Sequence, residues 1–326
     1  MTDIFCKFPW HSIYVSPSGR VENCCISKNK LGHVSEFDAA LIRNNRLKRA
    51  FVANEQPEGC SACFNNPGNK YKDSILPFVD KDFRYGTNTE DFKLRYLDIR
   101  WKNTCTLSCV YCTPEFSSTW AKLKNSDVEI NKQDANKQLK EWLEPQLVDL
   151  RRVYLAGGEP LIVKDNEWLL EKLLAVNPEC KILVNTNAQN FDTRIFELLK
   201  NFDVTWLVSG ENVGKDFEQV RRGASWDTFV KNVRWLKENN QRVLFQTIFH
   251  TLNVDDIFNF LYFVEAEGFS LSQNVSLNYI MGPEYDPAVQ LDAEERARIT
   301  QNINNYSNLH PEIKPQFDAI LTQLNR

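Results

Sequence analysis

The chain has 326 residues, 42% of them hydrophobic, and a formal net charge of −4 from 39 basic and 43 acidic side chains. This length suits one large domain or one and a half, and no apolar run is long enough to span a bilayer. The slight acidity argues against a broad nucleic-acid footprint, and the first six residues lack the charged and apolar regions of a secretion signal. We therefore expect a soluble cytoplasmic protein that binds neither membrane nor nucleic acid.

Nine cysteines in such a protein favour metal binding or catalysis over disulfides, because reducing compartments keep thiols free. The first part of the chain holds Cys6, Cys24, Cys25, Cys60 and Cys63. Between the first two of these, residues 13–22 predict a small hairpin whose turn is Pro17-Ser18-Gly19. This hairpin would carry Cys24 back towards Cys6.

A predicted strand at Leu94 to Arg100 leads into a loop that contains Cys105, Cys109 and Cys112. Thiolates at positions one, five and eight of a loop can hold one face of a [4Fe-4S] cluster, where a purely structural cluster normally takes four cysteines. One iron would keep an open position for chemistry. The alternatives are a zinc knuckle, a disulfide pair or three unrelated core thiols, and zinc would need a second cysteine pair about 15 to 20 residues away.

From this strand onwards, short β-rich runs alternate with amphipathic helices, which is typical of βα units and a parallel sheet. The further predicted strands are Arg152–Ala156, Lys181–Thr186, Val204–Ser209, Val243–His250 and Val275–Ile280. The predicted helices between them include Glu167–Val176, Thr193–Asn201, Trp226–Glu238 and Asp255–Glu267. Six strands with helical crossovers predict an α/β fold with a partial (β/α)6 barrel like that of TIM.

The pattern breaks at residues 282–287, and two further helices are predicted at Asp292–Asn305 and Ile313–Leu324. We expect these C-terminal helices to cover the open edge of the barrel or one end of its sheet, because an uncovered edge strand invites pairing with other chains.

Polar residues lie at or near the carboxyl ends of the later predicted strands, the usual location of barrel active sites. They are Asn185-Thr186-Asn187, Ser209-Gly210-Glu211, Gln246, His250 and Asn278. The alternative for each is a capping role at the following helix.

The cysteine loop resembles the Cx3CxΦC loop of the radical S-adenosylmethionine (SAM) superfamily, with Tyr111 as Φ. Gly157-Gly158-Glu159-Pro160, one strand-helix unit later, resembles the family's GGEP motif. The resemblance implies that SAM chelates the open iron through its amino nitrogen and carboxylate. An electron from the cluster would then release a 5′-deoxyadenosyl radical, which abstracts hydrogen from an unreactive carbon.

The same resemblance implies roles for individual residues around SAM. Tyr111 would lie near the adenine, and Gly157, Gly158 and Glu159 would hold the aminium group, although a strand-to-helix turn is the alternative for this segment. Residues 186–188 resemble the family's TNG with Ala for Gly, which implicates Asn187, and residues 208–211 resemble its SxDG-like strand end with a displaced acid, which implicates Ser209. Arg221 would pair with the SAM carboxylate, and Arg222 is the second candidate for this role. The alternative is that both arginines lie in a solvated basic turn.

The first part of the chain resembles the twitch and SPASM auxiliary-cluster modules, in which a Cys, a hairpin Gly and a Cys five residues later begin the ligand set. Cys6, Gly19 and Cys24 fit, and Cys60 with Cys63 could complete four thiolates around a second [4Fe-4S] cluster. Cys25 is then not expected to be a ligand, since consecutive side chains on a strand point to opposite faces. The module precedes the core here, whereas it usually follows it, and a zinc-ribbon-like site with the same thiolates is the alternative.

These patterns predict an auxiliary module at residues 1–92, the SAM core at 93–282 and a helical extension at 283–326. The predicted function is SAM-dependent radical hydrogen abstraction. The first hypothesis for the overall reaction is modification of a peptide or protein side chain. A nucleotide or sugar substrate, or a non-enzymatic iron-sulfur or zinc protein, is the alternative. A flavodoxin or ferredoxin would supply electrons.

Overall fold

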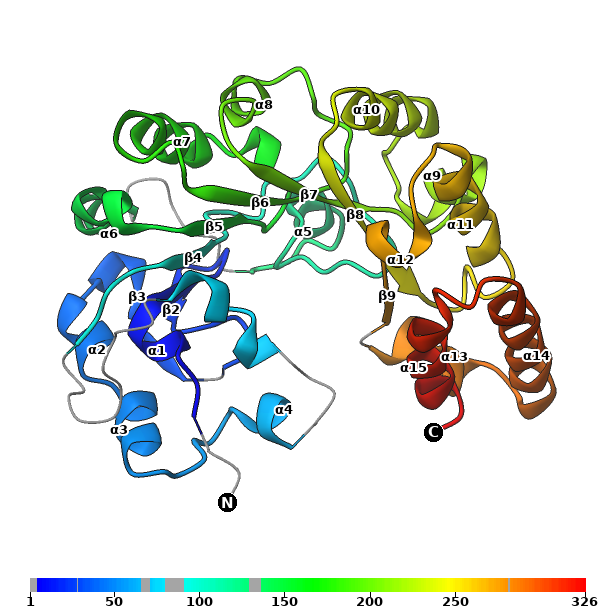
Figure 1. Cartoon of the computed structure of the whole chain (residues 1–326), viewed down its shortest axis with the longest axis horizontal. Coiled ribbons are helices and arrows are strands. Elements are labelled where there is room, and N and C mark those ends of the chain that lie inside the picture. The colour runs from blue at the N-terminus through cyan, green and yellow to red at the C-terminus, as the bar shows by residue number, and fades with distance from the viewer. Residues whose placement is uncertain (1–4, 28, 66–70, 80–90, 129–135, 281) are drawn as a thin grey trace. The chain divides into compact units, whose positions relative to one another are not determined.

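The structure, a computed structural model, describes residues 5–27, 29–65, 71–79, 91–128, 136–280 and 282–326 (Figure 1). The backbone forms two compact units. The first unit comprises Met1–Cys105, Pro114–Val184 and Asp192–Val204, and the second comprises Thr106–Thr113, Asn185–Phe191 and Thr205–Arg326.

The sheet of the first unit has the order β3-β2-β1-β4-β5-β6. Its antiparallel part consists of β1 (Ser12–Val15), β2 (Arg20–Glu22) and β3 (Lys30–His33). Its parallel part consists of β4 (Tyr96–Ile99), β5 (Arg152–Leu155) and β6 (Lys181–Thr186). The predicted strands therefore form within two residues of their expected ends, while β3 was not predicted.

The predicted N-terminal hairpin is confirmed, with the turn between β1 and β2. The backbone N–H of Ser16 donates to the carbonyl of Arg20 at 2.9 Å. Gly19 has φ +83°, and a Cβ at this position would lie 2.5 Å from Nε2 of His33. Only glycine fits this turn, because both the left-handed backbone and the close side chain exclude a larger residue.

The N-terminal hairpin extends the parallel sheet through a direct pairing of β1 with β4. The two strands run parallel, with Tyr14 opposite Asp98 and Val15 opposite Ile99. The first strand of the cysteine-rich segment is thus hydrogen-bonded to the strand that leads into the cluster loop. The domain boundary near residue 92 stays a prediction.

The helices of the first unit lie in two parts of the sequence. The short N-terminal helices are α1 (Phe8–His11), α2 (Ala39–Arg43), α3 (Arg46–Val52) and α4 (Ser61–Phe64). The later ones are α5 (Ser118–Leu123), α6 (Lys137–Leu143), α7 (Asp165–Val176) and α8 (Arg194–Leu199). Helix α7 buries Leu169, Leu170 and Leu173, the three-and-four spacing that predicted it.

The second unit contains the parallel strands β7 (Val204–Ser209), β8 (Arg242–Phe249) and β9 (Val275–Tyr279), in that order. Buried and half-buried residues alternate strictly along β7 and along β8 from its second residue. One face of these strands packs against helices, and the other face, which is only half-buried, is available to line a site.

The helices of the second unit follow and connect these strands. They are α9 (Gly214–Val220), α10 (Trp226–Glu238), α11 (Ile257–Ala266), α12 (Leu271–Asn274), α13 (Pro287–Gln290), α14 (Ala293–Leu309) and α15 (Lys314–Leu324). Aromatic rings fill the space under α9, α10 and α11, where Phe229 lies 4.7 Å from Phe217 and 6.5 Å from Phe260, centroid to centroid. No helix within the described ranges is long and apolar enough to cross a membrane.

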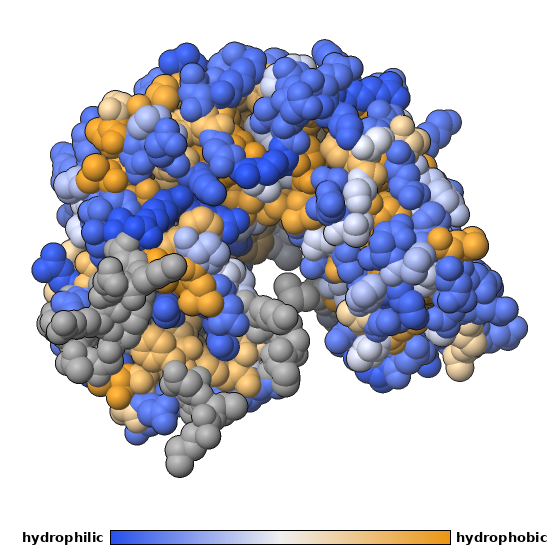
Figure 2. Space-filling view, in the orientation of Figure 1, coloured by the Kyte–Doolittle hydropathy of each residue, from blue (hydrophilic) through white to orange (hydrophobic). Residues whose placement is uncertain are grey.

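The predicted cover over the sheet edge is confirmed in α15. The Gln316 side chain accepts a hydrogen bond from the backbone N–H of Leu277 at 2.7 Å and donates one to the carbonyl of Val275 at 3.0 Å. A helix side chain thereby satisfies the free backbone groups of β9, the edge strand of this unit. The surface over α14 and α15 is mostly hydrophilic on the face seen in Figure 2, as expected for helices that bury one side only.

Candidate functional site

The second unit brings the cysteine loop onto the segment that contains Arg221. The N–H of Ser108 donates to the carbonyl of Arg222, and the N–H of Val110 donates to the carbonyl of Val220, both at 2.9 Å. Gly223, with φ +95°, allows this approach, because a Cβ there would lie 3.2 Å from the Thr106 carbonyl oxygen. Two segments about 110 residues apart in the sequence are therefore joined by backbone hydrogen bonds.

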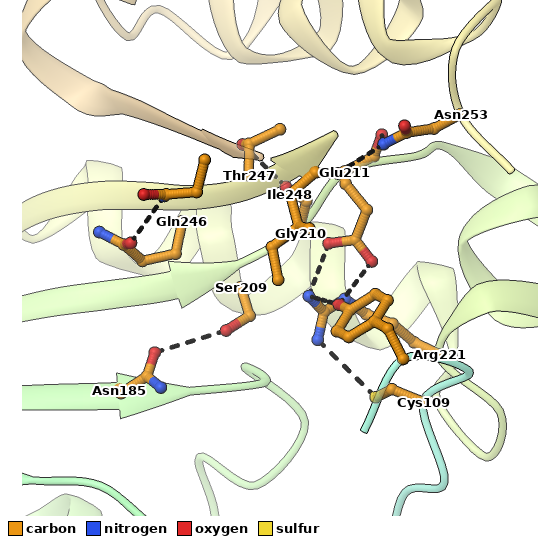
Figure 3. Close-up of polar contacts among 12 residues, drawn as sticks. Cys109, Asn185, Ser209, Gly210, Glu211, Arg221, Gln246, Thr247, Ile248 and Asn253 are labelled. Atoms are coloured by element: carbon orange, nitrogen blue, oxygen red, sulfur yellow. Dashed lines mark hydrogen bonds and ion pairs between the residues drawn. The ribbon is translucent and has the colours of Figure 1, made fainter. Parts of the chain in front are cut away.

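This docking places Arg221 beside Cys109, Tyr111 and Glu211 (Figure 3). Its Nη2 lies 2.6 Å from Oε2 of Glu211 and 2.6 Å from the hydroxyl of Tyr111, and that hydroxyl donates to Oε1 of Glu211 at 2.8 Å. Its Nη1 lies 3.9 Å from Sγ of Cys109. The side chains of Arg221 and Glu211 are only 5% and 1% exposed, so this is a buried ion pair.

Burial and this guanidinium set the protonation of the neighbouring groups. Burial raises the pKa of Cys109, and the charge of Arg221 partly opposes the rise. Burial also raises the pKa of Tyr111 well above its ordinary value, and it raises that of Cys112 to about 11. Burial alone would lower the pKa of Arg221, but the charge of Glu211 raises it overall. Arg221 therefore stays charged, while the thiols need a bound cation to become thiolates.

Two buried nitrogen atoms near this ion pair have no hydrogen-bond partner among the described residues, Nε of Arg221 and Nε2 of His250. The His250 ring lies 5.4 Å from that of Tyr111, and its Nδ1 accepts from the N–H of Leu252 at 3.1 Å, so Nε2 carries the proton of the neutral ring. Burial, helped by Arg221, lowers the pKa of His250 to about 3, which keeps the ring neutral. Both atoms are donors that a polar ligand could satisfy.

The loop after β7 is fixed to the end of β8 by Asn253. Its amide donates to the carbonyls of Ile248 at 2.8 Å and Glu211 at 3.5 Å, and its oxygen accepts from the N–H of His250 at 2.8 Å. These bonds hold Glu211 and His250 on neighbouring strand ends.

The other predicted strand-end residues make mainly local contacts. The Ser209 hydroxyl lies 3.4 Å from Oδ1 of Asn185. Oδ1 of Asn187 accepts from the N–H of Gln189 at 3.0 Å. Ala188, where the family motif has glycine, has φ +56°, so the chain keeps the left-handed turn that glycine would favour. The SAM-binding roles of Asn187 and Ser209 stay predictions.

In the first unit, Gly157 and Gly158 let the turn after β5 pack against the backbone that precedes Cys105. A Cβ on Gly157 would lie 2.9 Å from the carbonyl oxygen of Lys102, and one on Gly158 would lie 2.1 Å from that of Thr104. The N–H of Glu159 donates to the Thr104 carbonyl at 2.7 Å, and its carboxylate caps the next turn by accepting from the N–H of Leu161 at 3.2 Å. The two glycines thus allow the turn after β5 to support the backbone that precedes Cys105, and Glu159 acts as a helix cap.

Gly158→Ala should destabilise the fold by more than about 3 kcal/mol, because backbone atoms rather than a movable side chain occupy the space of the new methyl group. Gly214→Ala is the matched comparison, since Gly214 has φ +56° but nothing within 4 Å of its Cβ position. It should cost only about 1 to 2 kcal/mol of backbone strain. Urea unfolding of both variants measures the difference, and equal losses would contradict the close approach.

Cys105 is fixed at its backbone by the start of α5. The Ser118 hydroxyl accepts from the N–H of Cys105 at 3.1 Å, and the Thr119 hydroxyl donates to its carbonyl at 2.8 Å. The backbone around this predicted ligand is therefore held from the side of α5 as well as from the glycine turn.

The four N-terminal cysteines predicted to share a cluster lie near one another in the first unit. Burial raises the pKa of Cys6 to about 12, and the charges of Cys60 and Cys63 add to the rise, while the charge of Cys6 adds to that of Cys24. Backbone N–H groups point at three of the sulfurs: that of Phe8 at Cys6, those of Ile26 and Ser27 at Cys24, and that of Lys72 at Cys63. Such donors stabilise thiolates in metal centres.

Cys25 has other neighbours, but not for the predicted reason, because β2 ends at Glu22 and Cys24 and Cys25 lie in the turn beyond that strand. Its sulfur is 3.2 Å from the hydroxyl of Tyr71 and forms a hydrogen bond with the buried carboxyl group of Asp98. Asp98 also accepts from Arg100 at 3.3 Å. Cys25 therefore joins the N-terminal segment to a polar group in the middle of β4.

A family model described as the radical SAM superfamily matches residues 99–264, half of the chain. The chain belongs to the radical SAM superfamily, and it is accordingly an enzyme that uses SAM with a [4Fe-4S] cluster. The family prediction and the predicted cofactor are thereby confirmed, while the auxiliary module and the individual ligands stay predictions.

Curated relatives match only part of their own length. GTP 3′,8-cyclase of Clostridium botulinum (strain Okra / Type B1) is 27% identical over 142 residues, which is 43% of this chain and 43% of the relative. Molybdenum cofactor biosynthesis protein 1 of Dictyostelium discoideum is 25% identical over 181 residues, 54% of this chain and 28% of that protein. The matches span less than half the length of either relative.

Solved structures support the fold. The structure titled "Native anSMEcpe with bound AdoMet" has a TM-score of 0.50 and 13% identity, and covers 67% of this chain and 62% of that one. Streptococcus suis SuiB bound to S-adenosylmethionine has a TM-score of 0.48 and 17% identity, and covers 81% of this chain and 57% of that one. The first likeness and the family match confirm the predicted α/β class with an open, partial barrel.

The pairing of Glu211 with Arg221 and Tyr111 was not predicted, although Glu211 and His250 were expected at strand ends. The role of Asn253 was not predicted either. An acid two residues after a predicted strand, ten residues before an arginine, was the signal available for the pair.

Proposed function

We propose that Cys105, Cys109 and Cys112 hold a [4Fe-4S] cluster whose fourth iron binds SAM. When bound there, SAM and the reduced cluster supply a 5′-deoxyadenosyl radical that abstracts hydrogen from a substrate carbon. The observation that carries the proposal is the docking of the cysteine loop onto residues 220–223, which sets Cys109 beside a buried guanidinium.

The residues of this site fit the proposed cofactor in charge and in hydrogen bonding. Arg221 is a fixed cation, and its buried Nε–H has no partner in the described part of the chain, so it suits an anionic group such as a carboxylate. The neutral His250 adds an N–H donor of the same kind. Glu211 holds both Arg221 and the Tyr111 hydroxyl, and thereby fixes Tyr111 for packing against the adenine.

Glu159 is proposed to bind the SAM aminium group. Glu159 is 1% exposed, and its carboxylate accepts from the N–H of Leu161 as a helix cap. Gly157 and Gly158, which allow this turn to lie against the backbone before Cys105, would bring their carbonyls to the same ligand. Asn187 and Ser209 are proposed to complete the SAM site from the strand ends.

We further propose a second [4Fe-4S] cluster on Cys6, Cys24, Cys60 and Cys63. Zinc bonds of about 2.3 Å would bring its sulfurs to about 3.8 Å from one another in a tetrahedron. Among the described residues, no three of these sulfurs lie within 4.8 Å of one another. The backbone N–H groups directed at three of the sulfurs support a cluster held by thiolates.

The proposed substrate is a peptide or protein side chain, because an auxiliary iron-sulfur module beside a SAM core resembles enzymes of that kind. A nucleotide is the second candidate, since the similar Clostridium protein is named a GTP 3′,8-cyclase. We also propose a cytoplasmic location with a flavodoxin or ferredoxin as electron donor, in line with nine cysteines that form no disulfide among the described residues.

The test is made on anaerobically reconstituted protein mixed with SAM and dithionite. We expect 5′-deoxyadenosine to form without added substrate, at a slow rate. Persistent absence of this product from protein that contains both clusters would favour a non-enzymatic iron-sulfur protein. Incubation with peptides or with GTP should raise the rate for the right substrate class.

A further inference from the structure

A second group of metal-ligating side chains lies in the second unit, on helices that the proposed reaction does not use. Nδ1 of His310 is 3.7 Å from Oε1 of Glu265 and 3.6 Å from Oε1 of Glu312. The three ligand atoms all lie within 4.8 Å of one another. Glu265 belongs to α11, whereas His310 and Glu312 lie in the turn between α14 and α15.

The separations suit an ion between the ligands better than direct hydrogen bonds. Both N–O distances exceed the 3.2 Å or so of an N–H···O bond. They approach the spacing of about 3.4 Å that nitrogen and oxygen ligands take around tetrahedral zinc with bonds of about 2.1 Å. Among the described residues, no Lys or Arg pairs with either carboxylate, so two acids face one imidazole.

A buried hydroxyl gives an independent sign of a missing ligand. Tyr306 in α14 is 5% exposed, and its hydroxyl has no hydrogen-bond partner in the described ranges. Its ring stacks on His310 with centroids 4.3 Å apart. This stacking places Tyr306 directly against the imidazole of the proposed ligand group.

We propose that Glu265, His310 and Glu312 bind one divalent transition-metal ion, with Zn²⁺ as the best fit, and that the Tyr306 hydroxyl lies beside it. One imidazole with two carboxylates favours zinc over calcium or magnesium, which take oxygen ligands only. The ion would tie α11 to the α14–α15 turn. Since Gln316 of α15 covers the edge of β9, the metal would strengthen that cover.

The test uses the full chain with its clusters reconstituted anaerobically, so that the seven cysteines proposed as cluster ligands are occupied. Equilibrium dialysis against Zn²⁺ should show one equivalent that His310→Gln and Glu312→Gln each lose or bind at least tenfold more weakly. Glu294→Gln is the matched control, because Glu294 is an exposed carboxylate on α14 outside the group, and it should keep the equivalent.

Thermal unfolding gives a second measurement on the same proteins. A hundredfold excess of Zn²⁺ over its Kd should raise the unfolding midpoint of the native chain by about 5 °C, and Mg²⁺ should not. The rise should vanish in His310→Gln, and the stacking on Tyr306 that this variant loses lowers its midpoint equally with and without zinc. Equal zinc binding by the native chain and both variants, or no rise in the native chain, would overturn the proposal.

Discussion

Replacing Cys105, Cys109 and Cys112 together by alanine is expected to abolish formation of 5′-deoxyadenosine from SAM. The fourth iron can bind SAM only if three thiolates hold the other irons, and alanine removes all three. The measurement is product formation by anaerobically reconstituted protein with dithionite, followed by chromatography. The loss should be complete, because no other residues are proposed to hold this cluster.

Cys60→Ala is the informative comparison for this experiment. Cys60 is a proposed ligand of the second cluster only, so this variant should still bind and cleave SAM. Its iron content should fall from about eight atoms to about four per chain. Cleavage of SAM by the triple variant would show that the loop is not the catalytic centre, and unchanged iron in Cys60→Ala would argue against the second cluster.

Glu211→Gln is expected to lower the free energy of unfolding by about 3 to 5 kcal/mol, since it leaves the buried charge of Arg221 without a counterion. This loss is large beside a total stability of about 5 to 15 kcal/mol. The amide keeps the shape of the carboxylate, so lost charge rather than lost packing is tested. Urea unfolding of the cluster-free protein, followed by circular dichroism, measures it.

An exposed ion pair provides the control for Glu211→Gln. Lys314 and Asp318 lie 3.0 Å apart on α15, with side chains 45% and 53% exposed. Asp318→Asn should cost at most about 1 kcal/mol, because water screens and solvates both charges. If Glu211→Gln costs no more than this, Arg221 does not depend on Glu211.

Arg221→Lys should also weaken SAM binding, since a single ammonium group cannot reproduce the shared contacts of the guanidinium.

The repeating units of the fold could be predicted because each has its own periodicity. Val204–Ser209 and Trp226–Glu238 form as predicted to the residue, and β8 begins and ends one residue earlier than expected. Strand β3 was missed because Lys30–His33 is short, contains a glycine and buries only Leu31. Its place is decided by pairing with β2, which local sequence does not reveal.

The motifs of the site could be predicted from the sequence, but the contacts between those motifs could not. The spacing of the cysteines and the glycine turn are local signals, and they located both segments. The contact of Cys109 with Arg221 joins residues 112 positions apart, and no periodicity links them. The packing role of Gly157 and Gly158 could not be predicted, because the resemblance assigned them to SAM binding. The structure shows that they also allow close approach to the backbone of residues 102–104.

The pairing of β1 with β4 has a consequence for the order in which the chain folds during synthesis. Tyr14 lies opposite Asp98, so 98 − 14 = 84 residues must be made before the first strand meets its parallel neighbour. Until then β1 is the unpaired edge of a small three-stranded sheet with β2 and β3, whose strands are only three or four residues long. Cys6 and Cys24, which flank the hairpin, are made before β4, so the proposed second cluster gains the support of the parallel sheet only after β1 has paired with β4.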